Sequence, residues 1–195
     1  MDGTYDAWTR LKENMYSCRG CYLSGEKRIL GCGNTDARIM IVGDIPSPLD
    51  LEKGEAFSGE VGKYVKGLLN LIDIDPDDVY MTYLVNCNGA SVKSPKSEAT
   101  EACINCLRRQ FSLIKPEIVI TLGRVAARKL ISEDFLISRD HGKLFSKGKV
   151  MFMGTYNPTS FSFEKSFSKL MLDDFLVIKE FCDTYPQIKG TDRNS

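Results

Sequence analysis

The chain has 195 residues, of which 43% are hydrophobic, so it can bury one substantial core and does not need a second domain. Its 26 basic and 26 acidic residues give a formal net charge of zero, which excludes bulk electrostatic attraction to nucleic acid and leaves only a local basic patch for that purpose. No apolar run approaches the roughly 20 residues of a membrane span, and residues 1–13 lack the apolar core of a secretory signal, so we expect a soluble cytoplasmic protein.

Strand and helix patterns alternate along the chain. After a first helix over residues 6–16, four short apolar runs predict buried strands at 38–43, 79–86, 117–123 and 149–154. Helical spacing predicts further helices at 60–72, 97–114, 124–131 and 165–181. We therefore predict an α/β fold, a three-layer α/β/α sandwich with a central, mostly parallel four-stranded sheet. It forms one domain over residues 1–186, followed by a polar tail at 187–195 that we expect to fray.

The loops that follow the predicted strands are the first place to look for a ligand site. In open parallel sheets, ligands bind in the crevice formed by the loops at the carboxyl ends of the strands. These loops start here at Gly43, Asn86, Gly123 and Gly154.

Seven cysteines in a chain of this length indicate free thiols or metal ligands rather than a disulfide framework. Cys18 and Cys21 form a CxxC pair, a spacing that lets two thiolates bind one metal centre. Two ligand sets are open: Cys18, Cys21, Cys103 and Cys106 for zinc, or Cys18, Cys21, Cys87 and Cys103 for an iron-sulfur cluster. The alternative is a set of independent buried thiols, and we interpret Cys32 and Cys182 in that way.

Several motifs resemble the iron-sulfur uracil-DNA glycosylases called family 4. The main one is GDIPSPLDLEKGEAFSGEVG at 43–62, and the others are NTDARIMIVG, DVYMTYLVNC, EACINCL, LIKPEIVITLGRVAARKL and GTYNPTSF, in the order of that family. The resemblance covers most of residues 18–161. It implies a 4Fe-4S cluster as cofactor, with Cys18, Cys21, Cys87 and Cys103 as ligands and Cys106 as a neighbour.

The same resemblance assigns residues to the reaction. A glycosylase must flip its base out of the stack, and Phe57 with Gly43 would then form the surface on which the base stacks. Asp44 stands where the family has a glutamate, and it would orient a water or stabilise the positively charged sugar. The structural alternatives are a core anchor for Phe57 and a turn cap for Asp44.

Two positions depart from the family pattern. Asn157, followed by Pro158 and Thr159, stands where the family has a histidine, so it can donate a hydrogen bond to the leaving base but cannot carry positive charge, and it is otherwise a turn residue. Tyr83 stands where the family has its uracil-reading asparagine, and it would fill the uracil pocket or reshape it for another base. We assign no role to His141, the only histidine.

The predicted partner is DNA, bound by a monomer. Phosphate contacts are expected from short polar and basic side chains in or beside the strand-end loops, with Phe161 as a candidate wedge: Ser58, Lys63, Lys93, Lys96, Arg124 and Ser160. The sequence thus predicts a DNA-repair glycosylase that hydrolyses the N-glycosidic bond of a flipped deaminated base, uracil or a related one. The alternatives are an iron-sulfur DNA-binding protein on the same fold with little or no activity, and a zinc-clamped nucleotide-binding module.

Overall fold

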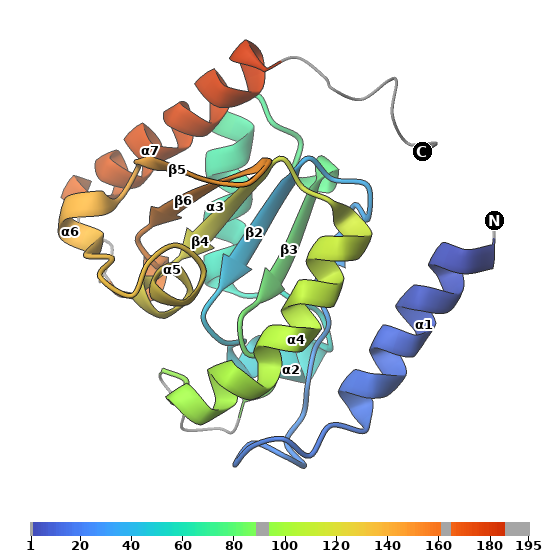
Figure 1. The fold of residues 1–195 in the computed structure, drawn as a ribbon. Coiled ribbons are helices and arrows are strands. Elements are labelled where there is room, and N and C mark those ends of the chain that lie inside the picture. Colours follow the sequence, from blue (N-terminus) through green and yellow to red (C-terminus); the bar gives the residue numbers. More distant parts are fainter. Residues whose placement is uncertain (1, 89–93, 161–164, 186–195) are drawn as a thin grey trace.

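A computed structural model of the chain describes residues 2–88, 94–160 and 165–185 (Figure 1). The predicted polar tail at 187–195 lies outside these residues, as do Lys93 and Phe161. No helix among the described residues is both long and apolar enough to cross a membrane.

The centre of the fold is a sheet whose four parallel strands confirm the four predicted ones. They are β2 (Ile39–Gly43), β3 (Val79–Tyr83), β4 (Ile118–Leu122) and β6 (Val150–Thr155). Every residue of β2, β3 and β4 is buried, as expected for strands covered on both faces.

The sheet has six strands, so the prediction of four was too low. Two antiparallel strands, β1 (Cys32–Gly33) and β5 (Leu144–Lys147), extend its edges and give the order β1-β3-β2-β4-β6-β5. Neither edge strand was predicted, because β1 has only two residues and β5 is largely exposed, so neither forms an apolar run.

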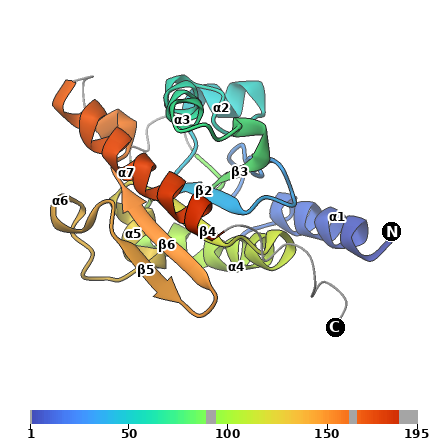
Figure 2. The same cartoon turned by 90° about the horizontal axis from the view of Figure 1, so that it is seen from above.

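Helices cover both faces of the sheet (Figure 2). One face packs against α3 (Glu60–Leu71) and α7 (Lys165–Thr184), and the other against α4 (Ser97–Ile114) and α5 (Arg124–Leu130). The predicted helices are thereby confirmed, and α4 begins and ends at the predicted residues because Lys115 takes a left-handed conformation just before Pro116. The three-layer sandwich is therefore confirmed.

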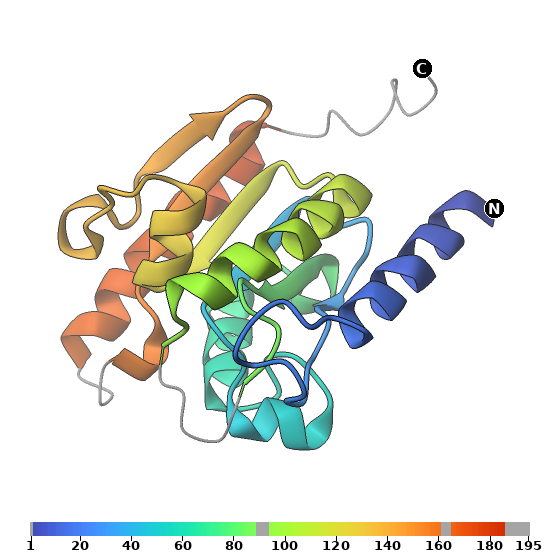
Figure 3. The same cartoon turned by 60° about the horizontal axis from the view of Figure 1, so that its bottom comes forward.

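The remaining helices lie at the periphery. The first helix, α1 (Asp2–Tyr16), starts four residues earlier than predicted and lies beside α4 (Figure 3). The short helices α2 (Pro48–Lys53) and α6 (Ile137–Asp140) were not predicted. The α2 helix begins with a capping box in which Ser47 and Asp50 bind each other's backbone N–H groups.

The strand order creates a crevice between β2 and β4. From β2 the chain crosses to β3 on one side, through α3, and it then returns through α4 to place β4 on the other side of β2. Loops diverge at such a reversal and leave a crevice outside the carboxyl ends of the two strands. Asp44 directly follows β2 and Gly123 directly follows β4, so both lie at this point.

Candidate functional site

Asp44 caps the first turn of α5 from the neighbouring strand. Gly123, the residue before α5, has no side chain to cap the helix, and the Asp44 carboxylate instead accepts a hydrogen bond from the backbone N–H of Ala126 at 2.7 Å. Burial raises the pKa of Asp44 to about 6, although the N–H groups of Ala126 and Val125 and the charge of Arg124 act in the opposite direction. The carboxylate is therefore ionised at neutral pH but is protonated under mildly acidic conditions.

Asp44 and Asn157 both lie next to the α-carbon of Gly123. A β-carbon added to Gly123 would lie 2.6 Å from the Oδ2 atom of Asp44 and 3.3 Å from the β-carbon of Asn157. Gly123 also has a φ of +104°, which disfavours any other residue. The packing of the Asp44 carboxylate and the Asn157 β-carbon around this position thus depends on glycine.

The two ends of the Asn157 amide have different roles. Its Oδ1 atom accepts hydrogen bonds from the N–H of Thr159 at 3.0 Å and from the Thr159 hydroxyl at 2.9 Å. Its Nδ2 group makes no hydrogen bond to the residues that the structure describes, and the side chain is half-buried. The amide is therefore held by its oxygen and can donate from its nitrogen.

Phe57 and Tyr83 stack on each other next to Gly43. Their ring centroids are 4.6 Å apart with an interplanar angle of 6°, and the two residues are 2% and 4% exposed. A β-carbon on Gly43 would lie 2.9 Å from the Tyr83 ring and 3.2 Å from the Phe57 ring. The structure thus brings the three predicted base-binding residues together, with the Phe57 ring covered by Tyr83.

Asp50 is a buried carboxylate that organises this aromatic pair. It accepts hydrogen bonds from the hydroxyl of Tyr83 at 2.8 Å, from the N–H and hydroxyl of Ser47 at 2.8 and 2.7 Å, and from the N–H of Ser58 at 2.8 Å. Burial by itself would raise the pKa of Asp50, but these hydrogen bonds outweigh it and lower the pKa. The sequence contained one sign of Asp50, the Ser-Pro-x-Asp capping pattern at 47–50, but none of its bond to Tyr83.

The predicted phosphate contacts fall into different environments. Arg124 is exposed and lies next to Asp44, on the rim of an open pocket of about 410 Å³ that is also lined by Arg128 and Lys129. Ser58 is engaged with Asp50 through both its N–H and its hydroxyl, and Lys63 forms an exposed ion pair with Glu60 at 2.8 Å. The side chain of Ser160 lies outside the described residues. Among the described residues, Arg124 is thus the predicted cation whose charge acts on the Asp44 carboxylate.

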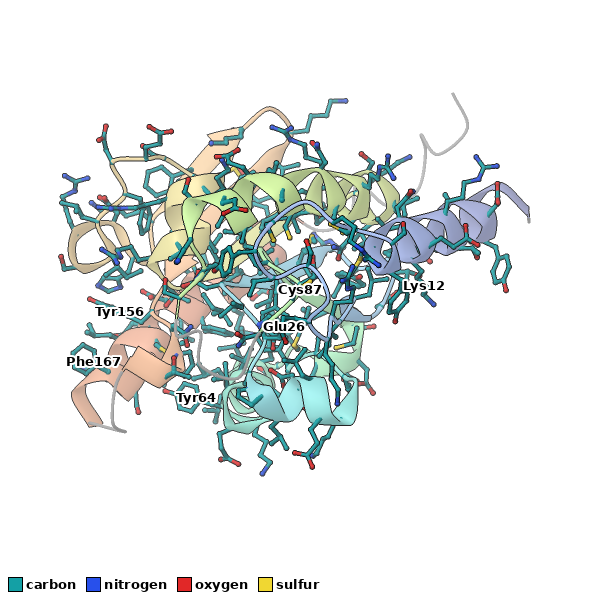
Figure 4. All side chains as sticks on the ribbon, turned by 90° about the horizontal axis from the view of Figure 1, so that it is seen from below. Lys12, Glu26, Tyr64, Cys87, Tyr156 and Phe167 are labelled. Atoms are coloured by element: carbon teal, nitrogen blue, oxygen red, sulfur yellow. The ribbon has the colours of Figure 1, made fainter. Side chains whose placement is uncertain are left out.

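The cysteines gather at one end of α1 and α4. A cavity of about 190 Å³ is lined by Cys18, Cys87, Cys103 and Cys106, and Cys21 packs against the same buried cluster. Figure 4 views the molecule from below and labels Cys87 near its centre, underneath the loop that joins α1 to the sheet. Within the described residues, no three potential ligand side chains are close enough together to be assigned as a metal site.

Two of these thiols, Cys87 and Cys103, are buried, and their pKa values are raised. Burial, opposed by the charge of Arg28 and assisted by the nearby Cys103, Cys21 and Cys18, raises the pKa of Cys87 to about 11. The sulfur of Cys103 accepts a hydrogen bond from the backbone N–H of Asn86, an interaction that favours a thiolate. Burial raises the pKa of Cys106, and Cys103 and Cys18 also act to raise it, whereas Cys21 does not contribute. The Cys106 sulfur accepts a hydrogen bond from the side-chain amide of Gln110 at 3.6 Å.

The sequence reasoning missed a buried network around His141. The Nδ1 atom of His141 is 2.8 Å from the carboxylate of Asp174, which is 3% exposed and also accepts a hydrogen bond from the hydroxyl of Thr155. The imidazole packs on the ring of Tyr156, with 4.9 Å between the ring centroids. Tyr156 directly precedes Asn157 in the chain. Figure 4 labels Tyr156 beside Phe167, whose ring centroid is 5.7 Å away. His141, to which the sequence assigned no role, is therefore half-buried beside the loop that carries Asn157.

Comparison with known proteins gives a consistent result. A family model described as the uracil DNA glycosylase superfamily matches residues 30–176. A type-4 uracil-DNA glycosylase from Archaeoglobus fulgidus is 32% identical over 176 residues, which are 85% of this chain and 88% of that protein. A type-4 uracil-DNA glycosylase from Sulfurisphaera tokodaii is 28% identical over 92% of this chain and 86% of that protein. A DNA polymerase from Bacillus phage SP01 is 25% identical over 78% of this chain and 16% of the polymerase.

Proposed function

Because the chain belongs to the uracil DNA glycosylase superfamily, we propose that it is a DNA glycosylase that hydrolyses the N-glycosidic bond of a flipped, deaminated base. The observation that carries the proposal is that the Asp44 carboxylate and the Asn157 side chain both lie next to Gly123, where the strand order reverses between β2 and β4. These two groups differ in kind, an anion and a neutral donor. The reaction needs both, because the sugar becomes positive while the leaving base becomes negative.

Asp44 acts on the sugar. Its pKa of about 6 leaves it ionised at pH 7.5, so it stabilises the positive charge that develops on the sugar and orients the attacking water. The water adds its oxygen to the C1′ carbon, the bond from C1′ to the base nitrogen breaks, and the bonding electrons leave with the base. The proton of the water passes to the carboxylate and then to solvent.

Asn157 acts on the leaving base. Its Nδ2 group donates a hydrogen bond to a carbonyl oxygen of the base, where negative charge accumulates as the bond breaks. Thr159 holds the amide oxygen, so this orientation costs little additional ordering. A neutral amide stabilises an anion less than an imidazolium does, and the reaction therefore depends strongly on Asp44.

We further propose a 4Fe-4S cluster held by Cys18, Cys21, Cys87 and Cys103. In addition to burial, Cys18 and Cys21 raise the pKa values of both Cys87 and Cys103, whereas only Cys18 of this pair acts on Cys106, and this difference supports the proposal. When bound, the cluster supplies a structural cross-link between the α1 end, the β3 end and α4, and hydrolysis of a glycosidic bond needs no redox step from it. Binding displaces the protons that burial favours on Cys87 and Cys103.

One observation favours a second candidate function, an iron-sulfur DNA-binding protein with little or no glycosylase activity. The Phe57 ring is covered by Tyr83, so a base cannot stack there without moving a buried side chain. In this alternative, Asp44 serves only as the cap of α5.

One experiment separates the two functions. The purified protein is incubated with oligonucleotides that carry a single uracil, hypoxanthine or xanthine, and each product is treated with alkali to cleave abasic sites. We expect cleavage at one or more of these bases by the wild-type protein and none by the Asp44→Asn variant. DNA binding without cleavage of any substrate would refute the glycosylase and support the binding protein.

The cluster is tested separately by anaerobic purification. We expect a brown protein with a broad absorption near ~400 nm from the thiolate-iron transitions, together with iron and sulfide. A colourless protein that contains zinc would contradict the cluster and support the zinc-clamped alternative.

A further inference from the structure

The aromatic pair at the end of β2 and β3 leaves no room for a base on Phe57. Phe57 is 2% exposed, so its faces and edges are already covered, and the Tyr83 ring lies parallel to it at 4.6 Å. This is the geometry in which a flat aromatic ring or a nucleobase stacks on a phenylalanine. The phenol ring is six-membered and planar, as is the ring of a pyrimidine. Tyr83 thus fills a space that a pyrimidine would otherwise fit.

The position of Tyr83 is fixed by hydrogen bonds at its far end. Its hydroxyl donates to Asp50 at 2.8 Å and accepts from the N–H of Phe57 at 3.1 Å. Asp50 is itself held by Ser47 and Ser58, so these contacts join α2, the Phe57 turn and β3. Phe57 has a φ of +56°, an uncommon conformation for a bulky residue, and the bond to Tyr83 helps to maintain it. Moving the ring would therefore break several buried contacts at once.

We propose that Tyr83 determines the specificity of this site, because its ring occupies the stacking place on Phe57 and excludes a pyrimidine such as uracil. This inference rests on the proposed function, since it concerns the base that the glycosylase accepts. The substrate base is then bound by its edge near Asn157, and Tyr83 keeps the stacking place on Phe57 closed to it. Replacing the ring with a smaller amide opens the stacking place to uracil and removes the steric exclusion.

The test compares three variants with the wild-type protein. Tyr83→Asn removes the ring, whereas Tyr83→Phe keeps the ring and removes only its hydrogen bonds with Asp50 and with the N–H of Phe57. Tyr80→Asn is the matched control: Tyr80 is equally buried on the same strand and hydrogen-bonded to Gln110 at 3.1 Å, but it belongs to the core on the α4 face. Melting temperatures identify the folded variants. If Tyr83→Asn does not fold, Tyr83→Leu, which lacks the flat ring, takes its place.

Two measurements are made, excision of uracil from a single-stranded oligonucleotide and binding of free uracil by equilibrium dialysis. We expect Tyr83→Asn to excise uracil at least about tenfold faster than the wild-type protein, Tyr83→Phe to show no such gain because it keeps the ring, and Tyr80→Asn to stay at the wild-type rate. A wild-type protein that excises uracil as fast as Tyr83→Asn would overturn the inference.

The proposed glycosylase function and the inference about Tyr83 are refuted by different results. If no variant excises any base, the proposed function fails, and the dialysis then decides the inference. Uracil binding by Tyr83→Asn but not by the wild-type protein supports the role of Tyr83, and equal binding by both refutes it. If the wild-type protein excises another base and Tyr83→Asn gains neither binding nor excision of uracil, the glycosylase stands and the inference fails.

Discussion

Replacing Asp44 with asparagine should abolish activity and at the same time stabilise the protein at neutral pH. Burial raises the pKa of Asp44 to about 6 from its ordinary value of 3.8, so the folded state holds the ionised form at a cost. A tenfold change in an ionisation constant is worth about 1.4 kcal/mol, so the full difference corresponds to about 3 kcal/mol. Because Asp44 is partly exposed, we expect the free energy of unfolding of Asp44→Asn at neutral pH to exceed that of the wild-type protein by about 1–3 kcal/mol.

The sign of the effect follows from the raised pKa. The folded state binds the proton more tightly than the unfolded state, so the contribution of Asp44 to stability is present below pH 3.8 and is lost as the pH rises through about 6. Asn at this position has no charge, and its oxygen still accepts the hydrogen bond from Ala126. The difference in free energy of unfolding between Asp44→Asn and the wild-type protein should therefore be near zero at pH 4 and reach its full value above pH 7.

The assay is a series of melting curves from pH 4 to 8 on wild-type and Asp44→Asn protein with equal iron content. In a chain of this size, 1–3 kcal/mol corresponds to a melting temperature higher by about 3–10 °C at pH 7.5. The excision rate of the wild-type protein should rise as the pH passes through about 6, and the variant should lose at least about a hundredfold of that rate. A difference in melting temperature that does not grow with pH would refute the assignment of a strained, ionised carboxylate.

Three further outcomes are expected. Cys103→Ser should lose the absorption near ~400 nm and the bound iron, whereas Cys106→Ser should keep both, and the reverse result would move the ligand set to Cys106. Arg124→Ala should weaken binding to single-stranded DNA and lower the slope of log affinity against log salt by about one, and an unchanged slope would remove Arg124 from the interface. His141→Ala should lower the free energy of unfolding by about 1–3 kcal/mol, because the buried Asp174 then keeps only its hydrogen bond from Thr155, and urea denaturation curves that coincide with the wild type would contradict this.

Much of the architecture followed from local patterns in the sequence. Strands β2 and β4 are uninterrupted apolar runs because both of their faces are buried, and such runs are visible without any tertiary information. The α4 helix was predicted to the residue because Pro116 marks its end. The meeting of Asp44 and Asn157 was also foreseeable in outline, since the carboxyl ends of parallel strands lie at one edge of the sheet.

The edge strands and the stacking of Tyr83 on Phe57 could not be predicted from the sequence and are seen only in the folded chain. Edge strand β5 is exposed and has no apolar pattern, so only its pairing with β6 defines it. Tyr83 bonds to Phe57 and Asp50 across 26 and 33 residues, and no local periodicity encodes a contact of that kind.

The position of the acid therefore belongs to what the sequence by itself determined, because Asp44 directly follows a strand that its apolar pattern reveals. What only the tertiary structure decided is that Tyr83 lies flat on Phe57 with its hydroxyl bound to Asp50. That arrangement depends on side-chain direction and on packing between segments distant in the chain, and these are fixed only when the core closes around them.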